Sequence, residues 1–409
     1  MNDQSKLIWP PGGITEVPYR IYSDQEIFER EMARIFCGEG WAYVGLSVEI
    51  PEIGDYLVSQ IGQRSVVITR GQDGQISGFA NRCAHRGVKI CRRSKGNTRF
   101  FVCPYHQWSY DAQGGLRGVP FIKGVSGKGG MPADFDRAAH SLPRLAITVH
   151  NGVIFASFNQ NPPPFEDYLG KTNLAYFNRV FDGRELRLLG YSRQLIPGNW
   201  KLMFENIKDP YHASLLHVFL VTFGLFRADQ DSQVAMDDSG GHALLISRRG
   251  EQRRTSATKD IANLREDFVL SDPRLLDPVK EFPDNATVVM QTLWPNLIVQ
   301  QQSNTLAMRQ IRPRHPGAFE LAWTFFGYAD DDEAMITRRL RQANLMSSAG
   351  LVSADDSEVI KLAQDGVTQY SDDRGVLLMG GTGRADESHM VTETAVRAFY
   401  DHYRRVMEL

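Results

Sequence analysis

Two short motifs, each with one cysteine and one histidine, hold the residues of this chain best suited to chemistry. Cys83 and His85 lie in NRCAHRG, and Cys103 and His106 lie in FVCPYHQW. Seventeen residues separate His85 from Cys103. A thiolate and an imidazole on each of two loops can hold a [2Fe–2S] cluster in which two cysteines bind one iron and two histidines bind the other. This pattern predicts electron transfer.

A structural zinc ion is the alternative, because two cysteines and two histidines are also a common zinc set. Zinc fingers usually place both cysteines before both histidines, whereas each motif here carries one of each. We therefore expect a Rieske-type cluster, whose histidine ligands raise its potential above that of an all-cysteine centre. Trp108 is expected either to shield the second loop from water or to be ordinary core.

A second possible metal site lies in PGNWKLMFENIKDPYHASLLH, which contains Asp209, His212 and His217. Two imidazoles and one carboxylate form the facial triad of non-haem Fe(II), which leaves positions open for O₂ and substrate. Positions five apart lie about 140° apart around a regular helix. We therefore expect a bend or a π-bulge at Pro210, so that both histidines reach one ion.

The carboxylate of this second site is expected in SADDSEVIKLAQ, where a helix would begin. Asp209 is too close to His212 in sequence to be the obvious third ligand. Asp355 and Asp356 compete for the role, and simple helix capping is the alternative for either.

Composition limits the classes of function. The chain has 409 residues, 42% of them hydrophobic, and a formal net charge of −2, so neither nucleic acid nor a membrane is expected as a partner. Four cysteines are too few for a disulfide framework. No segment has the pattern of a signal peptide or a membrane span, and we expect a cytoplasmic protein.

The order of helical segments and short alternating runs along the sequence predicts an α+β fold with two domains. Residues 1–41 form a helical segment, with Ser23 as the expected N-cap, that packs with the later domain. Residues 42–158 alternate in short runs and form a small antiparallel β domain that contains both Cys–His motifs. Residues 159–409 form a larger α+β domain with a curved antiparallel sheet.

These residues together resemble the large (alpha) subunit of Rieske non-haem iron ring-hydroxylating oxygenases. The resemblance runs nearly end to end and is carried by NRCAHRG, CPYHQWSYD, GNWKLMFENIKDPYHASLLH, the SADD segment and HMVTET. The chain is most similar to the branch of salicylate hydroxylase, anthranilate dioxygenase and terephthalate dioxygenase. The larger domain would then be a helix-grip-like catalytic domain.

The resemblance implies a role for each matching residue. The cluster ligands match Cys83, His85, Cys103 and His106. The ligands of the mononuclear Fe(II) match His212, His217 and Asp356. Asp209 matches the aspartate that joins the two centres, and it would link His106 of a neighbouring subunit to His212.

The family also implies partners. Electrons would come from NADH through a reductase and a ferredoxin, and a small β subunit would complete an α₃β₃ assembly, with α₃ alone as the alternative. Two other hypotheses remain open at this point: a Rieske electron carrier fused to a ligand-binding domain without catalytic iron, and a zinc-stabilised binding module.

The substrate pocket is expected to involve Arg309, Phe223 and Asn206. Arg309 lies among apolar residues in an apparent strand, and a buried arginine needs an anionic partner. It resembles the arginine that holds a substrate carboxylate in the terephthalate branch; an internal salt bridge or exposure at a strand edge is the alternative. Phe223, with Phe219 and Phe226, would line a slot for a flat ring or simply fill the core.

The terephthalate branch has a second arginine before its TET motif, where this chain has Met390 and Val391. This difference favours an aromatic monocarboxylate, such as salicylate or anthranilate, over a dicarboxylate. The identity of the acid, and whether one or two oxygen atoms enter the ring, stay open.

Overall fold

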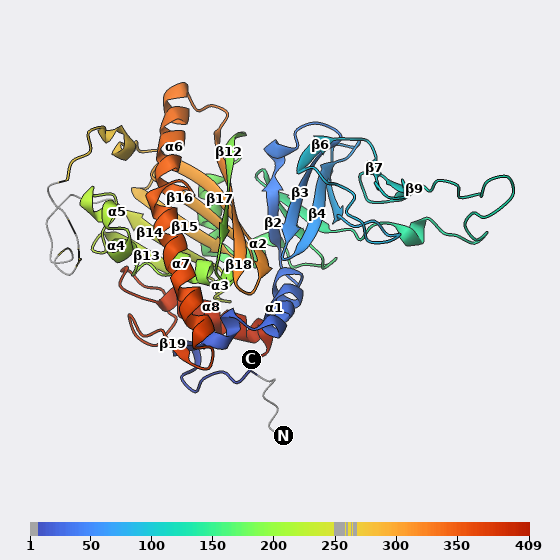
Figure 1. Ribbon diagram of the computed structural model, residues 1–409. Helices are drawn as coiled ribbons and strands as arrows, with labels where there is room; N and C mark the ends of the chain where they lie inside the picture. The colour runs from blue at the N-terminus through green and yellow to red at the C-terminus, as the bar shows by residue number, and fades with distance from the viewer. Residues whose placement is uncertain (1–6, 249–257, 259–260, 263, 265–267) are drawn as a thin grey trace, which may run out of the picture. The chain divides into compact units, whose positions relative to one another are not determined.

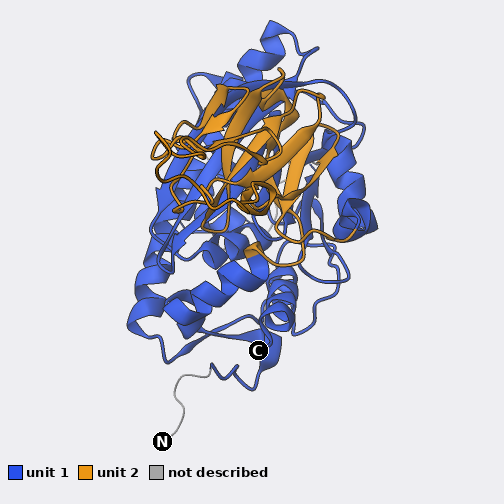
Figure 2. Ribbon diagram, turned by 90° about the vertical axis from the view of Figure 1, so that its right-hand side faces the viewer, with its two compact units in different colours: residues 1–35, 164–409 blue, residues 36–163 orange. Residues whose placement is uncertain are grey.

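The computed structural model in Figure 1 describes residues 7–248, 258, 261–262, 264 and 268–409. The chain divides into two units, Met1–Ile35 with Pro164–Leu409, and Phe36–Pro163 (Figure 2). The second unit is therefore inserted between two segments of the first. The expected boundaries, after residues 41 and 158, lie within six residues of these.

The inserted unit is built from three antiparallel sheets with the strand orders β5-β4-β3-β6, β10-β11-β2 and β7-β8-β9. Its strands are β2 (Ala42–Leu46), β3 (Asp55–Ile61), β4 (Arg64–Arg70), β5 (Ile76–Ala80), β6 (Lys95–Asn97), β7 (Phe101–Val102), β8 (Ser109–Tyr110), β9 (Leu116–Gly118), β10 (Ala146–His150) and β11 (Val153–Ser157). Two Cys–His loops leave this framework, one between β5 and β6 and the other between β7 and β8.

The larger unit is centred on a seven-stranded antiparallel sheet with the order β12-β18-β17-β16-β15-β14-β13. These strands are β12 (Leu186–Ile196), β13 (Asp231–Met236), β14 (Ala243–Arg248), β15 (Ala286–Leu293), β16 (Leu297–Gln302), β17 (Thr305–His315) and β18 (Ala318–Tyr328). A separate pair joins β1 (Glu16–Pro18) to β19 (Arg374–Val376). The fold is therefore mixed α+β, as predicted.

Helices pack against this sheet, and α6 and α7 run across its strands in Figure 1. The helices are α1 (Gln25–Glu31), α2 (Phe165–Val180), α3 (Trp200–Lys208), α4 (Ala213–Leu216), α5 (Val218–Thr222), α6 (Glu333–Met346), α7 (Leu351–Gln369) and α8 (Thr394–Met407). No helix among the described residues is long and apolar enough to cross a membrane.

Two local expectations differ from the structure. The N-cap of α1 is Asp24 rather than Ser23, because the Asp24 carboxylate accepts the N–H groups of Glu26 and Ile27. Asp355 and Asp356 do not cap α7, whose N-cap is Gly350; they lie one turn inside that helix.

The register of the central sheet brings one group of side chains to the same face. Met290 of β15 is paired with Leu245 on one side and with Gln300 on the other. Val288 is paired with Gln302 in the same ladder. Since side chains alternate along a strand, these residues share the face that carries the site.

Candidate functional site

The two Cys–His loops have the same backbone hydrogen-bond pattern. In the first, the N–H of Gly87 donates to the carbonyl of Cys83 (2.9 Å); in the second, the N–H of Gln107 donates to the carbonyl of Cys103 (3.0 Å). Gly87 and Gln107 both have positive φ, 73° and 57°. The two loops are thus built alike, and each presents its cysteine and histidine from an equivalent frame.

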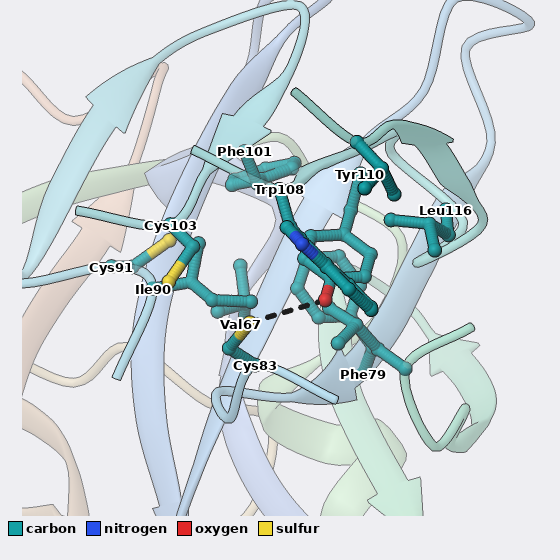
Figure 3. Packing of buried hydrophobic residues seen from close by; sticks show 12 residues of the cluster. Val67, Phe79, Cys83, Ile90, Cys91, Phe101, Cys103, Trp108, Tyr110 and Leu116 are labelled. Carbon is teal, nitrogen blue, oxygen red and sulfur yellow. Dashed lines mark hydrogen bonds between the residues drawn. The ribbon is translucent and has the colours of Figure 1, made fainter. Parts of the chain in front are cut away.

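The cysteines of the two loops share one buried cluster, and their histidine rings lie side by side. Cys83 and Cys103 are buried in the core that Figure 3 draws, with Phe79, Phe101 and Leu116 around them. The rings of His85 and His106 lie 4.6 Å apart. Nδ1 of His85 is buried and has no hydrogen-bond partner among the described residues. A nitrogen left free in this way fits a metal ligand, so the donor set suits a [2Fe–2S] centre.

Trp108 and Tyr110 contact the cluster loops from within this core. The Trp108 ring stacks on His85 with centroids 4.9 Å apart and an interplanar angle of 6°. The Tyr110 hydroxyl lies 3.2 Å from Sγ of Cys83, the contact dashed in Figure 3, and 3.2 Å from the backbone N of Ala84. Both residues therefore shape the surroundings of the first loop, the kind of contact that tunes a metal centre.

A break in the helical segment places the second set of ligands. Lys208 ends α3, His212 is the N-cap of the short helix α4, and His217 separates α4 from α5 with φ −89° and ψ 61°. His217 lies at a break and not inside one regular helix. The five-residue spacing therefore no longer turns the two histidines away from each other. The rings of His212 and His217 lie 5.4 Å apart.

His212, His217 and Asp356 form a possible metal site, because each offers a ligand atom and these atoms all lie within 4.8 Å of one another. Oδ1 of Asp356 is 3.1 Å from Nε2 of His217 and 3.7 Å from Nε2 of His212. Two imidazoles and one carboxylate, with Asp356 buried, fit the donor set of non-haem iron.

Each imidazole contacts a second carboxylate through its other nitrogen. Nδ1 of His217 lies 3.2 Å from Asp355, and Nδ1 of His212 lies 3.4 Å from Asp209. Asp209 also accepts the N–H of Tyr211 (2.7 Å), which fixes its carboxylate. Carboxylates in this position orient a ligating imidazole and raise its basicity. The geometry thus gives Asp355 and Asp356 different roles, which spacing in the sequence did not separate.

The imidazoles and carboxylates of this site stabilise one another's charged forms. Although burial opposes the charged form, the neighbouring carboxylates of Asp209 and Asp356 raise the pKa of His212 to about 10. Burial also disfavours the Asp356 carboxylate, but the two imidazoles bring the pKa of Asp356 well below its usual range. A cation between the three groups can replace that proton, which again fits a metal.

An apolar cavity adjoins the three possible ligands. Its remaining lining comes from the sheet face and from the helices: Asn206, Ile207, Asp209, Ala213, Leu220, Phe226, Leu245, Val288, Met290, Gln300, Gln302, Arg309, Met346 and Val352. Polar groups are few and come mostly from β16 and β17, so a bound molecule meets polarity on one wall. Such a pocket suits a flat apolar ring with one polar substituent.

Arg309 is the cationic residue of this cavity. It is 3% exposed and has no ion pair with any residue that the structure describes. One guanidinium nitrogen donates to Oε1 of Gln300 (3.2 Å), and Nε has no hydrogen-bond partner within the described part of the chain. The guanidinium group stacks over the Trp323 ring, 4.4 Å from its centroid. Burial lowers the pKa of Arg309 to about 10, and the charge of Asp356 opposes that shift.

Asn206 and Phe223, the other two residues expected to contact the substrate, do not have the roles expected of them. Asn206 lines the cavity, but its amide donates to Oδ1 of Asp356 (3.0 Å), so it steadies a possible ligand. Phe223 does not line the cavity. The chain reverses after α5, where the N–H groups of Leu225 and Phe226 return to the carbonyl of Leu220, and this brings Phe226 to the wall in place of Phe223.

Several lining residues were absent from the sequence-based set. Gln300 and Gln302 lie at alternate positions of β16, a spacing that places both on one face. The run VQQQSN does predict a strand with a polar face. It does not predict that this face lines a cavity, because that depends on which strands are its neighbours. The side chain of Gln300 links Arg309 to Oε1 of Gln302 (3.2 Å), so these three residues form one polar wall.

Two family models match the chain. The model described as the ring-hydroxylating alpha subunit (catalytic domain) matches residues 177–409, and the Rieske [2Fe-2S] domain matches residues 40–127. The first covers the sheet, the three possible iron ligands and Arg309, and the second covers both Cys–His loops. The Rieske match excludes the zinc interpretation of the four loop residues.

Curated relatives resemble the chain along nearly its whole length. The large oxygenase component of salicylate 5-hydroxylase from Ralstonia sp. is 48% identical over 98% of this chain and 96% of the relative. The large subunit of anthranilate 1,2-dioxygenase from Burkholderia cepacia is 40% identical over 99% and 96%. Terephthalate 1,2-dioxygenase terminal oxygenase component subunit alpha 2 from Comamonas sp. is 40% identical over 99% and 98%.

Solved structures share the fold. Naphthalene 1,2-dioxygenase from Rhodococcus sp., bound to indole, superposes with a TM-score of 0.80 over 96% of this chain and 94% of that chain, at 24% identity. This likeness supports the α+β architecture with a Rieske unit and a catalytic unit.

Proposed function

Because the chain belongs to the family of ring-hydroxylating alpha subunits, with a Rieske [2Fe–2S] domain and a mononuclear iron domain, we propose that it hydroxylates an aromatic monocarboxylate. It is the large subunit of a terminal oxygenase that acts on aromatic rings. Salicylate 5-hydroxylation and anthranilate 1,2-dioxygenation are the two favoured reactions, since relatives with those activities cover nearly the whole chain.

The observation that carries the substrate proposal is the environment of Arg309. An arginine that is 3% exposed, without an acidic partner among the described residues, leaves a charge to be balanced by whatever enters the cavity. A carboxylate matches a guanidinium group in charge and in planar geometry. The apolar remainder of the lining then receives the ring.

The surroundings of Met390, near the C-terminal end of the chain, also favour a substrate with a single carboxylate. Met390, near the position where the terephthalate branch has its second arginine, is fully buried with Leu220, Phe226 and Met346. A second carboxylate in this apolar cluster would have no cation and would lose its hydration. This arrangement favours a monocarboxylic acid.

In this proposal Cys83, His85, Cys103 and His106 hold the cluster, and His212, His217 and Asp356 hold the iron. When bound, the cluster supplies single electrons and the iron supplies O₂ activation. Arg309 fixes the acid, Gln300 holds the guanidinium group in place, and the apolar lining excludes water from the ring. Asp209 orients His212 and is proposed as the link through which electrons reach it.

The proposed partners follow the family. Electrons come from NADH through a reductase and a ferredoxin, and a small β subunit joins the large subunit in an α₃β₃ assembly. The alternative of an electron carrier without catalytic iron is not favoured, because the three possible iron ligands converge beside a cavity.

The test is product analysis under ¹⁸O₂ with a reconstituted electron-transfer chain, offering salicylate, anthranilate, benzoate and terephthalate in parallel. We expect a hydroxylated product from one of the monocarboxylates and none from terephthalate. One labelled oxygen in the product indicates monooxygenation, and two indicate dioxygenation. Turnover of terephthalate in preference to all three monocarboxylates contradicts the proposal.

A further inference from the structure

The unit Phe36–Pro163 has a net positive charge, although the chain as a whole is slightly negative. It contains fourteen Lys and Arg residues against eight Asp and Glu, a formal charge of +6. Since the whole chain is −2, the other unit carries −8. The nearly neutral total therefore conceals two parts of opposite sign, and the positive part is the one that holds the cluster loops.

Within this unit the positive charge gathers around the cluster motifs. No acidic residue occurs between Asp73 and Asp111, a stretch that contains both Cys–His loops. It holds seven cationic residues: Arg82, Arg86, Lys89, Arg92, Arg93, Lys95 and Arg99. Lys95 pairs with Glu49, whereas the other six have no ion pair with any residue that the structure describes.

Three cations surround a hollow beside the first cluster loop. The hollow has a volume of about 450 Å³, and its cationic lining is Arg64, Arg82 and Lys89. All three side chains are exposed, and no acidic side chain lines the hollow. Arg64 lies over the ring of Phe158, 5.0 Å from the centroid, which holds its guanidinium group at the rim.

The floor of this hollow is hydrogen-bonded to the segment that follows the first cluster loop. Asn81 lies in the lining, is buried, and accepts the N–H groups of Ile90 and Cys91 through Oδ1. Its amide donates to the carbonyl of Cys91 (2.9 Å) and to Ser65 (3.1 Å). Arg82 and Gly87, which also line the hollow, flank Cys83 and His85 in the sequence. A molecule in the hollow therefore lies beside the first cluster loop.

We propose that this cationic hollow, Arg64, Arg82 and Lys89, is the docking surface for an acidic one-electron carrier protein that reduces the cluster. The inference rests on the proposed function, which requires an external source of electrons. In the step itself the carrier loses one electron and the cluster gains one, and no covalent bond forms or breaks. The occupant is an anionic protein surface around a redox centre.

Charge and exposure favour such a transient partner. Unpaired cations on the rim of an interface raise the rate of association with an acidic partner and let the complex dissociate again. An electron carrier must do both in every catalytic cycle. The acidic unit of a second copy of this chain also has the required charge, so the experiment must separate the two.

The experiment uses the loaded holoenzyme and a plant-type [2Fe–2S] ferredoxin, an acidic carrier whose potential lies below that of Rieske centres. The affinity of the oxidised ferredoxin is measured by calorimetry, and reduction of the cluster by the reduced ferredoxin is followed by stopped-flow absorbance. The test variant is Arg64→Glu with Lys89→Glu. The control is Lys123→Glu with Lys128→Glu, which makes the same change in net charge on exposed lysines outside the hollow.

At low ionic strength, where the Debye length is about 30 Å, we expect the hollow variant to lower the second-order reduction rate and the affinity about tenfold or more. The control should change both by about twofold or less, and the difference should shrink at physiological salt. Lys89→Glu alone gives a smaller effect in the same direction and avoids disturbing the Arg64–Phe158 contact. An unchanged absorbance spectrum establishes that the cluster is intact.

Equal slowing by the hollow and control variants overturns the inference, because it reflects net charge alone. A change in oligomeric mass by light scattering, with ferredoxin affinity unaffected, assigns the hollow to contact between copies of the chain and also overturns it. Both results leave the proposed function standing, since ferredoxin binding is measured without turnover and product formation is tested separately.

Discussion

Nδ1 of His217 lies 3.2 Å from Oδ2 of Asp355, while Nε2 of the same ring lies 3.1 Å from Asp356. Two adjacent residues of α7 therefore contact opposite sides of one imidazole. Neighbouring positions on a helix point about 100° apart, so Asp356 turns into the site and Asp355 supports it from the rim. His212 repeats the pattern between Asp356 and Asp209.

This arrangement predicts that Asp355 strengthens iron binding without being a ligand. Asp355→Ala removes the carboxylate that orients His217, and we expect iron affinity to fall about 10–100-fold. Competition with a chelator, read by iron analysis, measures the change. Asp365→Ala, at an exposed position of the same helix, is the control. Equal iron affinity in both variants would remove Asp355 from the site.

Asp209 is predicted to matter for electron transfer more than for metal binding. Asp209→Asn keeps an acceptor for the N–H of Tyr211 but removes the charge beside His212. We expect both metal centres to stay bound and turnover to stop, with a reduced cluster that is not reoxidised when substrate and O₂ are added. Full coupled activity in this variant would show that the proposed link is wrong.

Arg309 is predicted to set the affinity for the acid. Arg309→Met keeps an unbranched side chain against Trp323 but removes a charge-assisted hydrogen bond of about 1.5–3 kcal/mol. We therefore expect KM for the aromatic acid to rise about tenfold or more. Arg312→Met is the control, because Arg312 pairs with Glu320 and does not line the cavity. An unchanged KM in the Arg309 variant would exclude it from substrate binding.

Buried His242 and half-buried His402 predict a loss of stability in mild acid. Burial, with a smaller contribution from the charge of Lys208, lowers the pKa of His242 to about 4, although Asp237 opposes the shift. Burial and the neighbouring His242 likewise lower the pKa of His402 to about 4. The unfolded chain binds these protons near pH 6.5. Unfolding therefore takes up protons between about pH 6.5 and 4, and the free energy of unfolding falls as pH falls through that window, by at most ~1.4 kcal/mol per pH unit for each group.

Urea denaturation at several pH values in this window measures the slope. His402→Gln removes one of the two titrating groups, and we expect a shallower dependence on pH than in the wild type. His315→Gln, at an exposed histidine of β17, should leave the slope unchanged. Identical slopes in wild type and His402→Gln would mean that His402 does not contribute.

The sequence predicted the α+β class and the small antiparallel β domain because alternation and glycine-marked turns are local signals. The long strand β12 (Leu186–Ile196) is the first strand of the larger sheet along the chain. The break at His217 was not predictable in the same way. A bend was expected from the requirement that two histidines reach one ion, but its form depends on packing between α3, α4 and α5.

The residues that line the cavity were also only partly predictable from the sequence. Arg309 stood out because a cation among apolar residues is unusual anywhere in a sequence. Gln300, Gln302 and Phe226 did not stand out, because their role depends on which strands are neighbours and on where the chain reverses after α5. Phe223 and Phe226 are the same residue type in the same apolar stretch. Only the reversal of the chain after α5 determines which of them lines the cavity.

The most direct test of the account is the metal content of Asp356→Ala beside that of the wild type. Because a [2Fe–2S] cluster and one mononuclear iron share each chain, the wild type should hold three irons and two sulfides. The variant should hold two irons and two sulfides, keep the absorbance of the cluster, and form no hydroxylated product. Three irons in the variant, or two in the fully loaded wild type, would contradict the iron site at His212, His217 and Asp356.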